Sequence, residues 1–257
     1  MTGDKTMALN KPYYRIIRPF KVNSTSYLGG ISSHLVDFKY AQDRIELCRA
    51  YQLIEKDLLH LFEYIDPCDD NLNTYSHRTY ELFLRTATEF ETNCKRILEA
   101  NGYKKSGNLT IQDYYKIHQA SQLGHYKISL LLWPAAPKTF EPFKEWVEQV
   151  ENPYSLAWYK AYNEVKHDRY KNFKKASLEN VLTAISGLKA ILFSQFFIFT
   201  TIGSDSGMHS DDDTFGVSNI GEIFTVMPYK GWKPEECYDF DWEKIKNDDE
   251  PFEKFSF

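Results

Sequence analysis

The spacing of apolar residues predicts two long helices in the first part of the chain. Between residues 38 and 65, apolar side chains recur at steps of three and four, which places them on one face of a helix. Residues 76–100 carry a second stripe of this kind, and Gly102 follows at a natural helix end. Only a short turn with Pro67 separates the two segments, so we expect them to form an antiparallel helical hairpin.

Helix start signals continue through the middle of the chain. They lie at Thr110 with Asp113, at Glu141-Pro142, at Asn152-Pro153 and at Ser177. The third of these helices is expected to run through His167, and the last is strongly apolar as far as Gly203. The last helix is long enough to span a membrane, but Lys189 within it favours a buried core helix. We therefore predict an all-α helical bundle built on the hairpin, with no membrane segment.

Extended structure is predicted near both ends of the chain. Residues 13–22 are rich in aromatic and β-branched side chains, and Pro19 restricts them to a sheet edge or to two short pieces. Residues 222–227 are also strand-like, and we expect the two segments to pair in a small sheet beside the bundle. The chain then divides into an extended N-terminal segment (1–37), a helical domain (38–203) and a C-terminal extension (204–257).

The formal net charge of −5 is distributed unevenly along the chain. Residues 203–257 contain 14 acidic residues and 5 lysines, so the residues before them hold 26 of the 31 basic residues and 22 of the 36 acidic ones. A mildly basic body is therefore joined to an acidic, aromatic-rich tail. The body is the better place for an anionic ligand.

The composition also limits the compartment and the chemistry. The four cysteines lie far apart without the spacing of a zinc site, and the first residues lack the apolar run of a signal peptide. These features indicate a cytoplasmic protein with reduced thiols. Motifs of nucleotide-binding loops, serine hydrolases and zinc proteases are missing from the sequence, so no metal or other cofactor is expected.

The densest group of candidate site residues is the segment WYKAYNEVKHDRYKNFKK, residues 158–175. Asn163 and His167 are four residues apart, so they share one face of a helix. Histidine is the side chain whose ordinary pKa suits proton transfer near neutral pH, and the neighbouring Lys166 and Arg169 offer positive charge to a phosphate. The alternative is a solvated basic face with a histidine that only caps the helix.

This segment resembles the conserved helix of HEPN domains, a superfamily of helical ribonucleases. In that helix an arginine and a polar residue, often asparagine, precede a histidine. Asn163 stands at the polar position and His167 at the histidine position, whereas Tyr162 occupies the position of the arginine. A neutral tyrosine cannot supply the charge of that arginine, so Lys166 or Arg169 would have to replace it.

A second short motif lies on the predicted helix 76–100. Glu91 precedes Lys95 and Arg96 in the order Glu, three residues, Lys-Arg, which many HEPN proteins carry on an earlier helix. A glutamate four residues before a lysine is also a common helix-surface ion pair, worth only about 0.3–0.5 kcal/mol. Both interpretations stay open at this point.

The resemblance implies a homodimer that binds RNA and cleaves it without a metal, with His167 as general acid/base and Asn163 positioning the 2′-hydroxyl or the phosphate. The residues that it places at the binding site are Tyr162, Lys166, Arg169, Glu91 and Lys95. Such proteins act in defence or toxin–antitoxin systems. One alternative is a catalytically inactive interaction or scaffold protein, whose acidic C-terminal segment contacts a protein partner. Another is a small-molecule or nucleotide binder with a pocket between helices.

Overall fold

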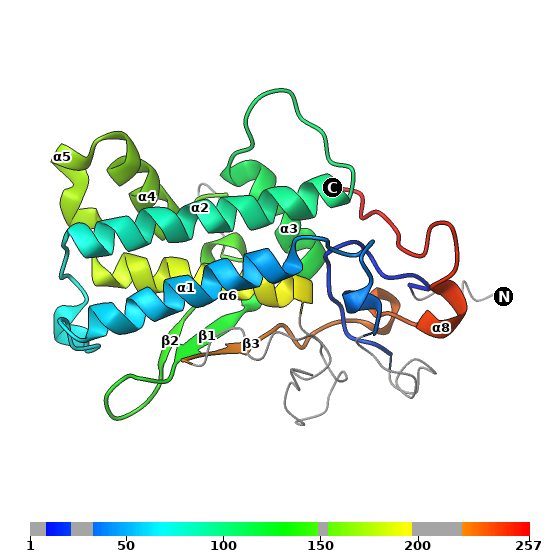
Figure 1. The fold of residues 1–257 in the computed structure, drawn as a ribbon, viewed down its shortest axis with the longest axis horizontal. Helices are drawn as coiled ribbons and strands as arrows, with labels where there is room; N and C mark the ends of the chain where they lie inside the picture. The colour runs from blue at the N-terminus through cyan, green and yellow to red at the C-terminus, as the bar shows by residue number, and fades with distance from the viewer. Residues whose placement is uncertain (1–8, 22–32, 149–153, 197–222) are drawn as a thin grey trace.

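The computed structural model describes residues 9–21, 33–148, 154–196 and 223–257, and these are mostly helical (Figure 1). The helices are α1 (Arg44–Phe62), α2 (His77–Ala100), α3 (Ile111–Ser121), α4 (Ala157–His167), α5 (Arg169–Asn172), α6 (Leu178–Phe196) and α8 (Trp242–Ile245). Short 3-10 helices cover Ser33–Val36, Asp69–Asn71, Leu123–His125, Lys144–Trp146, Phe173–Lys175 and Pro234–Glu236. The strands are β1 (Lys127–Leu130), β2 (Lys138–Phe140) and β3 (Phe224–Met227). The predicted predominance of helix is confirmed.

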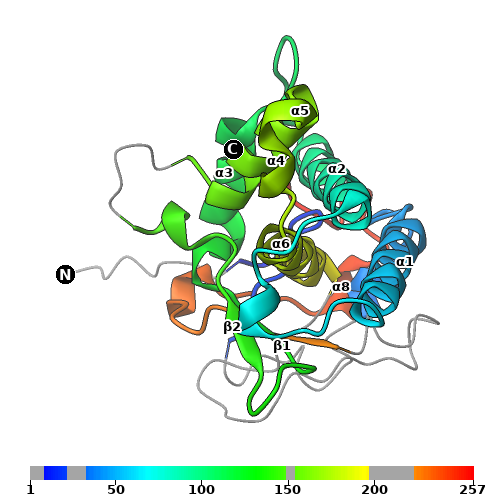
Figure 2. The ribbon, with the colours of Figure 1, turned by 90° about the vertical axis from the view of Figure 1, so that its left-hand side faces the viewer.

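Helix α6 lies at the centre of the fold. In Figure 2 it runs between α1, α2 and α4 on one side and the strands on the other, and it contacts all of these elements. Its sequence is apolar on nearly every face, as expected for a helix surrounded by protein. Lys189 of α6 is 8% exposed, and its Nζ lies 5.1 Å from the centre of the Tyr51 ring. Among the described residues, no helix has the length and apolar character to cross a membrane.

Local sequence accounts for α2, which lies beside α1 (Figure 1). The predicted stripe of this helix is fully buried: Phe83, Ala87, Phe90, Cys94 and Ile97. Ser76 caps the helix, because its Oγ accepts a hydrogen bond from Thr79 N at 3.1 Å while Thr79 Oγ1 accepts one from Ser76 N at 2.7 Å. Gly102 follows with φ +79°, a conformation that glycine adopts without steric cost. Helix α1 is shorter than predicted, because residues 37–43 form turns.

Asp113 anchors the start of α3, as its spacing from Thr110 predicts. Its Oδ2 accepts hydrogen bonds from Thr110 N at 2.6 Å and from Lys105 Nζ at 2.7 Å, and its Oδ1 accepts one from Tyr103 Oη at 2.8 Å. Burial alone would raise the pKa of Asp113, but these hydrogen bonds outweigh it and lower the pKa to about 2.

The sheet differs from the predicted one. β1 is its central strand and pairs antiparallel with both β2 and β3, so that Ile128 lies opposite Phe140 on one side and Val226 on the other. The expected pairing of residues 13–22 with the C-terminal strand is therefore wrong. The strand-like C-terminal residues pair with a hairpin from the middle of the chain, whose Ile128 is buried beside α6.

The segment between α3 and α4 is also not helical as predicted. Its described residues form the 3-10 helix Leu123–His125 and the β1–β2 hairpin, and between Glu141-Pro142 and residue 148 they form only the 3-10 helix Lys144–Trp146. Within this segment Phe143 stacks on Trp146 with ring centres 4.7 Å apart, and a hydrogen bond joins the segment to α4, since Trp158 Nε1 donates to the Pro142 carbonyl oxygen at 2.9 Å. These tertiary contacts outweigh the local preference for a helix start.

Residues 9–21 lie against residues 237–253 instead of against β3. Their backbones are joined by hydrogen bonds that include Leu9 N to Cys237 O (3.3 Å), Tyr238 N to Pro19 O (2.9 Å) and Glu253 N to Pro12 O (2.9 Å). The Arg18 guanidinium lies over the rings of Tyr13, Trp232 and Phe255, at 5.4, 5.0 and 5.5 Å from their centres. The described parts of the N-terminal segment and of the C-terminal extension therefore share one hydrophobic core with the helices.

Candidate functional site

Helix α4 carries the candidate site residues, and its buried face fixes their orientation. Trp158, Tyr162 and Val165 are almost fully buried. The Tyr162 ring meets the Phe83 ring of α2 edge-on, with centres 6.2 Å apart. Because this face is packed against α2, the opposite face of α4 and its C-terminal end are directed toward solvent.

His167 is the last residue of α4, and its side chain is exposed. Asn163 lies one turn earlier and is half-buried, with Nδ2 donating to the Tyr159 carbonyl oxygen at 3.1 Å. Within the described residues, His167 and Asn163 are not hydrogen-bonded to each other. The predicted shared face is present, but the two side chains do not form a preassembled pair in a single copy of the chain.

Basic side chains surround His167 on the surface of α4 and α5. We define the α4–α5 basic surface by its exposed side chains: Lys160, Lys166, His167, Arg169, Tyr170, Lys171, Lys174 and Lys175. Two carboxylates offset part of its charge, because Lys175 pairs with Glu164 at 2.6 Å and Lys171 pairs with Asp168 at 3.4 Å. Tyr170 is 96% exposed. This surface is open, and its cations outnumber its carboxylates.

Arg169 is fixed on aromatic rings at the edge of this surface. Its guanidinium lies 5.6 Å from the centre of the Tyr80 ring and 6.0 Å from the centre of the Phe173 ring. The Phe173 ring also contacts His77, the first residue of α2, at 5.0 Å between ring centres. The α4–α5 basic surface is therefore attached to the N-terminal end of α2.

Tyr162, at the position of the family's arginine, is 1% exposed and is not itself part of this surface. Its Oη accepts a hydrogen bond from Lys166 Nζ at 3.0 Å. This hydrogen bond, opposed by partial burial and assisted by the charge of Glu91, raises the pKa of Lys166. Lys166 therefore stays protonated at neutral pH, beside the position where the family has its arginine.

Glu91 lies next to α4, whereas Lys95 does not. Glu91 Oε1 accepts a hydrogen bond from Tyr159 Oη at 2.6 Å, and burial together with this hydrogen bond raises the pKa of Tyr159. Lys95 pairs instead with Glu99, at 3.8 Å, and its side chain is 59% exposed. The interpretation of Glu91 and Lys95 as a surface ion pair is therefore wrong. The structure brings Glu91 to the candidate site and leaves Lys95 outside it.

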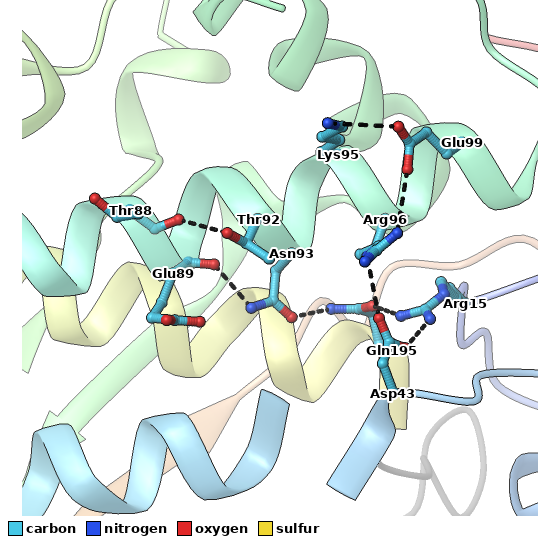
Figure 3. A network of polar contacts seen from close by, with 10 residues as sticks. All are labelled: Arg15, Asp43, Thr88, Glu89, Thr92, Asn93, Lys95, Arg96, Glu99 and Gln195. Atoms are coloured by element: carbon cyan, nitrogen blue, oxygen red, sulfur yellow. Dashed lines mark hydrogen bonds and ion pairs between the residues drawn. The ribbon is translucent and has the colours of Figure 1, made fainter. Parts of the chain in front are cut away.

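A polar network that is buried or partly buried except at Arg96 lies further along α2, and the sequence analysis did not identify it (Figure 3). Asp43 pairs with Arg15 and with Arg96, whose Nε lies 3.2 Å from Asp43 Oδ2. Arg15 Nη1 donates to Gln195 Oε1 at 3.3 Å, and Gln195 Nε2 donates to Asn93 Oδ1 at 2.8 Å. These residues come from four separate segments, so no local spacing in the sequence indicates the network.

The described residues contain no group of three or more histidine, cysteine, aspartate or glutamate side chains that could hold a metal ion. No protein-family model, no curated protein and no solved structure matches the chain. The geometry of the described residues is therefore the basis for any assignment of function.

Proposed function

We propose that this chain is an HEPN-like RNA-binding protein whose α4–α5 basic surface contacts the RNA backbone. The observation that carries the proposal is the exposure of His167 among lysine and arginine side chains, close in sequence to Tyr170, which is 96% exposed. Cations that meet successive phosphates release counterions on binding, and an exposed aromatic ring can stack on a base. The net negative charge of the chain does not oppose this, because 14 of its 36 acidic residues lie beyond residue 202.

Cleavage of the RNA by this surface would need no metal. His167 takes the proton of a 2′-hydroxyl as its oxygen bonds to the adjacent phosphorus, and Asn163 orients the reacting group. The bond from phosphorus to the 5′-oxygen then breaks, the 5′-oxygen takes a proton from water, and a 2′,3′-cyclic phosphate is left. Arg169 supplies the charge that stabilises the pentavalent phosphorus, because its guanidinium rests on aromatic rings and makes no hydrogen bond within the described residues. The charged Lys166 lies on the same surface.

The proposed active unit is a homodimer in which the α4–α5 basic surfaces of two copies face each other. In this proposal α1 and α2 are the helical hairpin of an HEPN-like bundle, and the protein acts in the cytoplasm in a defence or toxin–antitoxin system. Light scattering on the full chain tests the dimer: a monomer at all concentrations used for cleavage would contradict it.

Cleavage is tested by incubating mixed RNA with the purified chain in EDTA. We expect the native chain to cut RNA and His167→Ala to be slower by about 100-fold or more, because general acid/base catalysis contributes about 10²–10⁴-fold. His60→Ala is the matched control, since His60 is also exposed but lies on α1. Intact RNA with the native chain, or equal cutting by His167→Ala, would contradict the catalytic role.

A second candidate function is a catalytically inactive interaction protein, a scaffold or antitoxin-like subunit. The burial of Tyr162 supports it, because no cation stands at the family's arginine position. In this case the acidic C-terminal segment contacts a protein partner. RNA that is bound in a fluorescence anisotropy assay but stays intact in EDTA and in added magnesium would favour this alternative.

A further inference from the structure

A pocket of about 310 Å³ lies near the C-terminal end of α2. Arg15 from the N-terminal segment, Lys39 from the turns before α1 and Arg96 from α2 line it together with Asp43. The α4–α5 basic surface is attached to the other end of α2 at His77, and Arg96 lies 19 positions after His77, which is about 28 Å along a helix. The pocket is therefore separate from the proposed RNA-binding surface.

The pocket carries an excess of positive charge. Its lining residues include three cations and one carboxylate, Asp43. Both oxygens of Asp43 are already used, since Oδ1 pairs with Arg15 and Oδ2 with Arg96. Lys39 is exposed, and its side chain has no ion pair among the described residues. Glu99 pairs with Arg96 at 3.6 Å, but it is not among the residues that line the pocket.

The guanidinium of Arg15 is held in a fixed position. Arg15 is 6% exposed and has φ +57°, a left-handed conformation that is disfavoured for residues other than glycine. Its bonds to Asp43 and Gln195 hold it there, and Gln195 is in turn bonded to Asn93 (Figure 3). Tyr40 Oη also donates to the Gln195 carbonyl oxygen at 2.5 Å. A pocket built in this way is preorganised for an anion.

We propose that this pocket binds a small phosphorylated molecule of the nucleoside monophosphate or diphosphate class. Arginine presents N–H groups in a planar fork that matches phosphate oxygens, and Lys39 adds a mobile point charge at the opening. The Tyr14 ring lines the same pocket and offers an apolar surface to the rest of the ligand. The volume is near the lower limit for small-molecule sites and suits a small ligand better than a polymer.

The test is isothermal titration calorimetry of the full chain with inorganic pyrophosphate and with AMP. We expect one molecule to bind per chain, and we expect Lys39→Ala and Arg96→Ala each to weaken binding about tenfold or more, as for the loss of a charge-assisted hydrogen bond. Lys95→Ala is the matched control, because Lys95 is the neighbouring cation on α2 and lies outside the pocket. Arg169→Ala is also expected to leave both affinities unchanged.

Absence of binding by both probes at millimolar concentrations would overturn the proposal, and so would unchanged affinity in both pocket variants. If Arg96→Ala does not fold, Lys39→Ala decides the result, because an exposed side chain can be removed without loss of packing. A short RNA that binds more weakly to Lys39→Ala, with no binding of AMP or pyrophosphate, would also overturn it. Arg169→Ala changes only the RNA-binding surface. A failure of the pocket to bind AMP or pyrophosphate can therefore be distinguished from a failure of the proposed RNA binding.

Discussion

Positive charge lies near both ends of α2, but the two groups of cations differ in their exposure to solvent and in their pairing with carboxylates. At the N-terminal end, the cations of the α4–α5 basic surface come from one stretch of sequence, residues 160–175, and face solvent. At the C-terminal end, Arg15 and Arg96 come from distant segments and share the carboxylate of Asp43. Exposed cations on long side chains can follow a flexible polymer, and salt screens them. Cations fixed by a partly buried carboxylate suit a ligand of one shape.

The largest effect is expected when an arginine is placed inside the packed face of α4. Tyr162→Arg restores the family's residue type, but position 162 is 1% exposed and packed against Phe83. A buried charge without a partner destabilises, so the free energy of unfolding should fall by about 3 kcal/mol or more. Urea denaturation measures this change.

Tyr162→Phe is the control for that substitution. It keeps the ring and removes only the hydrogen bond from Lys166 Nζ, so we expect a loss of about 1 kcal/mol. A Tyr162→Arg chain with an unchanged urea midpoint would mean that this face of α4 opens to solvent, and the contrast between the two ends of α2 would not hold.

The next largest effect is expected at Asp43. Asp43→Asn removes the negative charge between Arg15 and Arg96 and leaves the guanidinium of Arg15, which is 6% exposed, without an ionic partner. We expect the free energy of unfolding to fall by about 3 kcal/mol. Glu164→Gln, which breaks the Lys175 pair on the basic surface, should shift the urea midpoint too little to resolve. Equal shifts in the two variants would contradict the comparison.

Stability at acid pH should depend on Asp113. Its pKa is lowered to about 2, and an unfolded aspartate titrates near 3.9, so its stabilising contribution is present above about pH 4 and is lost as the pH falls toward 2. The expected size is about 2 kcal/mol. Asp113→Asn should remove this part of the pH dependence in urea titrations between pH 2 and pH 6, approximate limits set by the two pKa values. An unchanged pH profile would show that Asp113 is not the titrating group.

The smallest effect on stability is expected at Tyr170. Tyr170→Ala should leave the free energy of unfolding unchanged within about 0.5 kcal/mol, because the side chain is 96% exposed. RNA binding should weaken about tenfold, since stacking of a base on an aromatic ring contributes about 1–3 kcal/mol. Fluorescence anisotropy with single-stranded RNA measures this. Tyr64→Ala, at an 84% exposed tyrosine just after α1, is the matched control and should bind RNA as the native chain does.

Elements fixed by short-range signals could be predicted from the sequence. The stripe and Ser76 cap of α2 and the Thr110–Asp113 start of α3 depend on residues three or four positions apart. The sheet could not be predicted, because β1 is a four-residue strand and its partner β3 begins 94 positions later. The local pattern at Glu141-Pro142 predicted a helix that does not form, because the stacking of Phe143 on Trp146 and the hydrogen bond from Trp158 determine the conformation of that segment.

The candidate site shows the same division. The exposed face that carries Asn163 and His167 could be predicted, because it depends only on helical spacing. The contact of Glu91 with Tyr159 could not, because it joins two helices 68 residues apart in sequence. Helical spacing also allowed Lys95 as the partner of Glu91, but in the structure Glu91 bonds to Tyr159 and Lys95 pairs with Glu99.

The pairing of residues 9–21 with residues 237–253 has a consequence for the order of folding. Tyr238 donates a hydrogen bond to the carbonyl oxygen of Ile16, 222 positions earlier, at 2.7 Å. At about 5–20 residues per second, a ribosome makes Tyr238 about 10–45 s after Ile16. Through that interval the Ile16 carbonyl oxygen lacks this hydrogen-bond donor. The helices can pack during synthesis, but the N-terminal segment reaches its native position only when nearly all of the chain has been made.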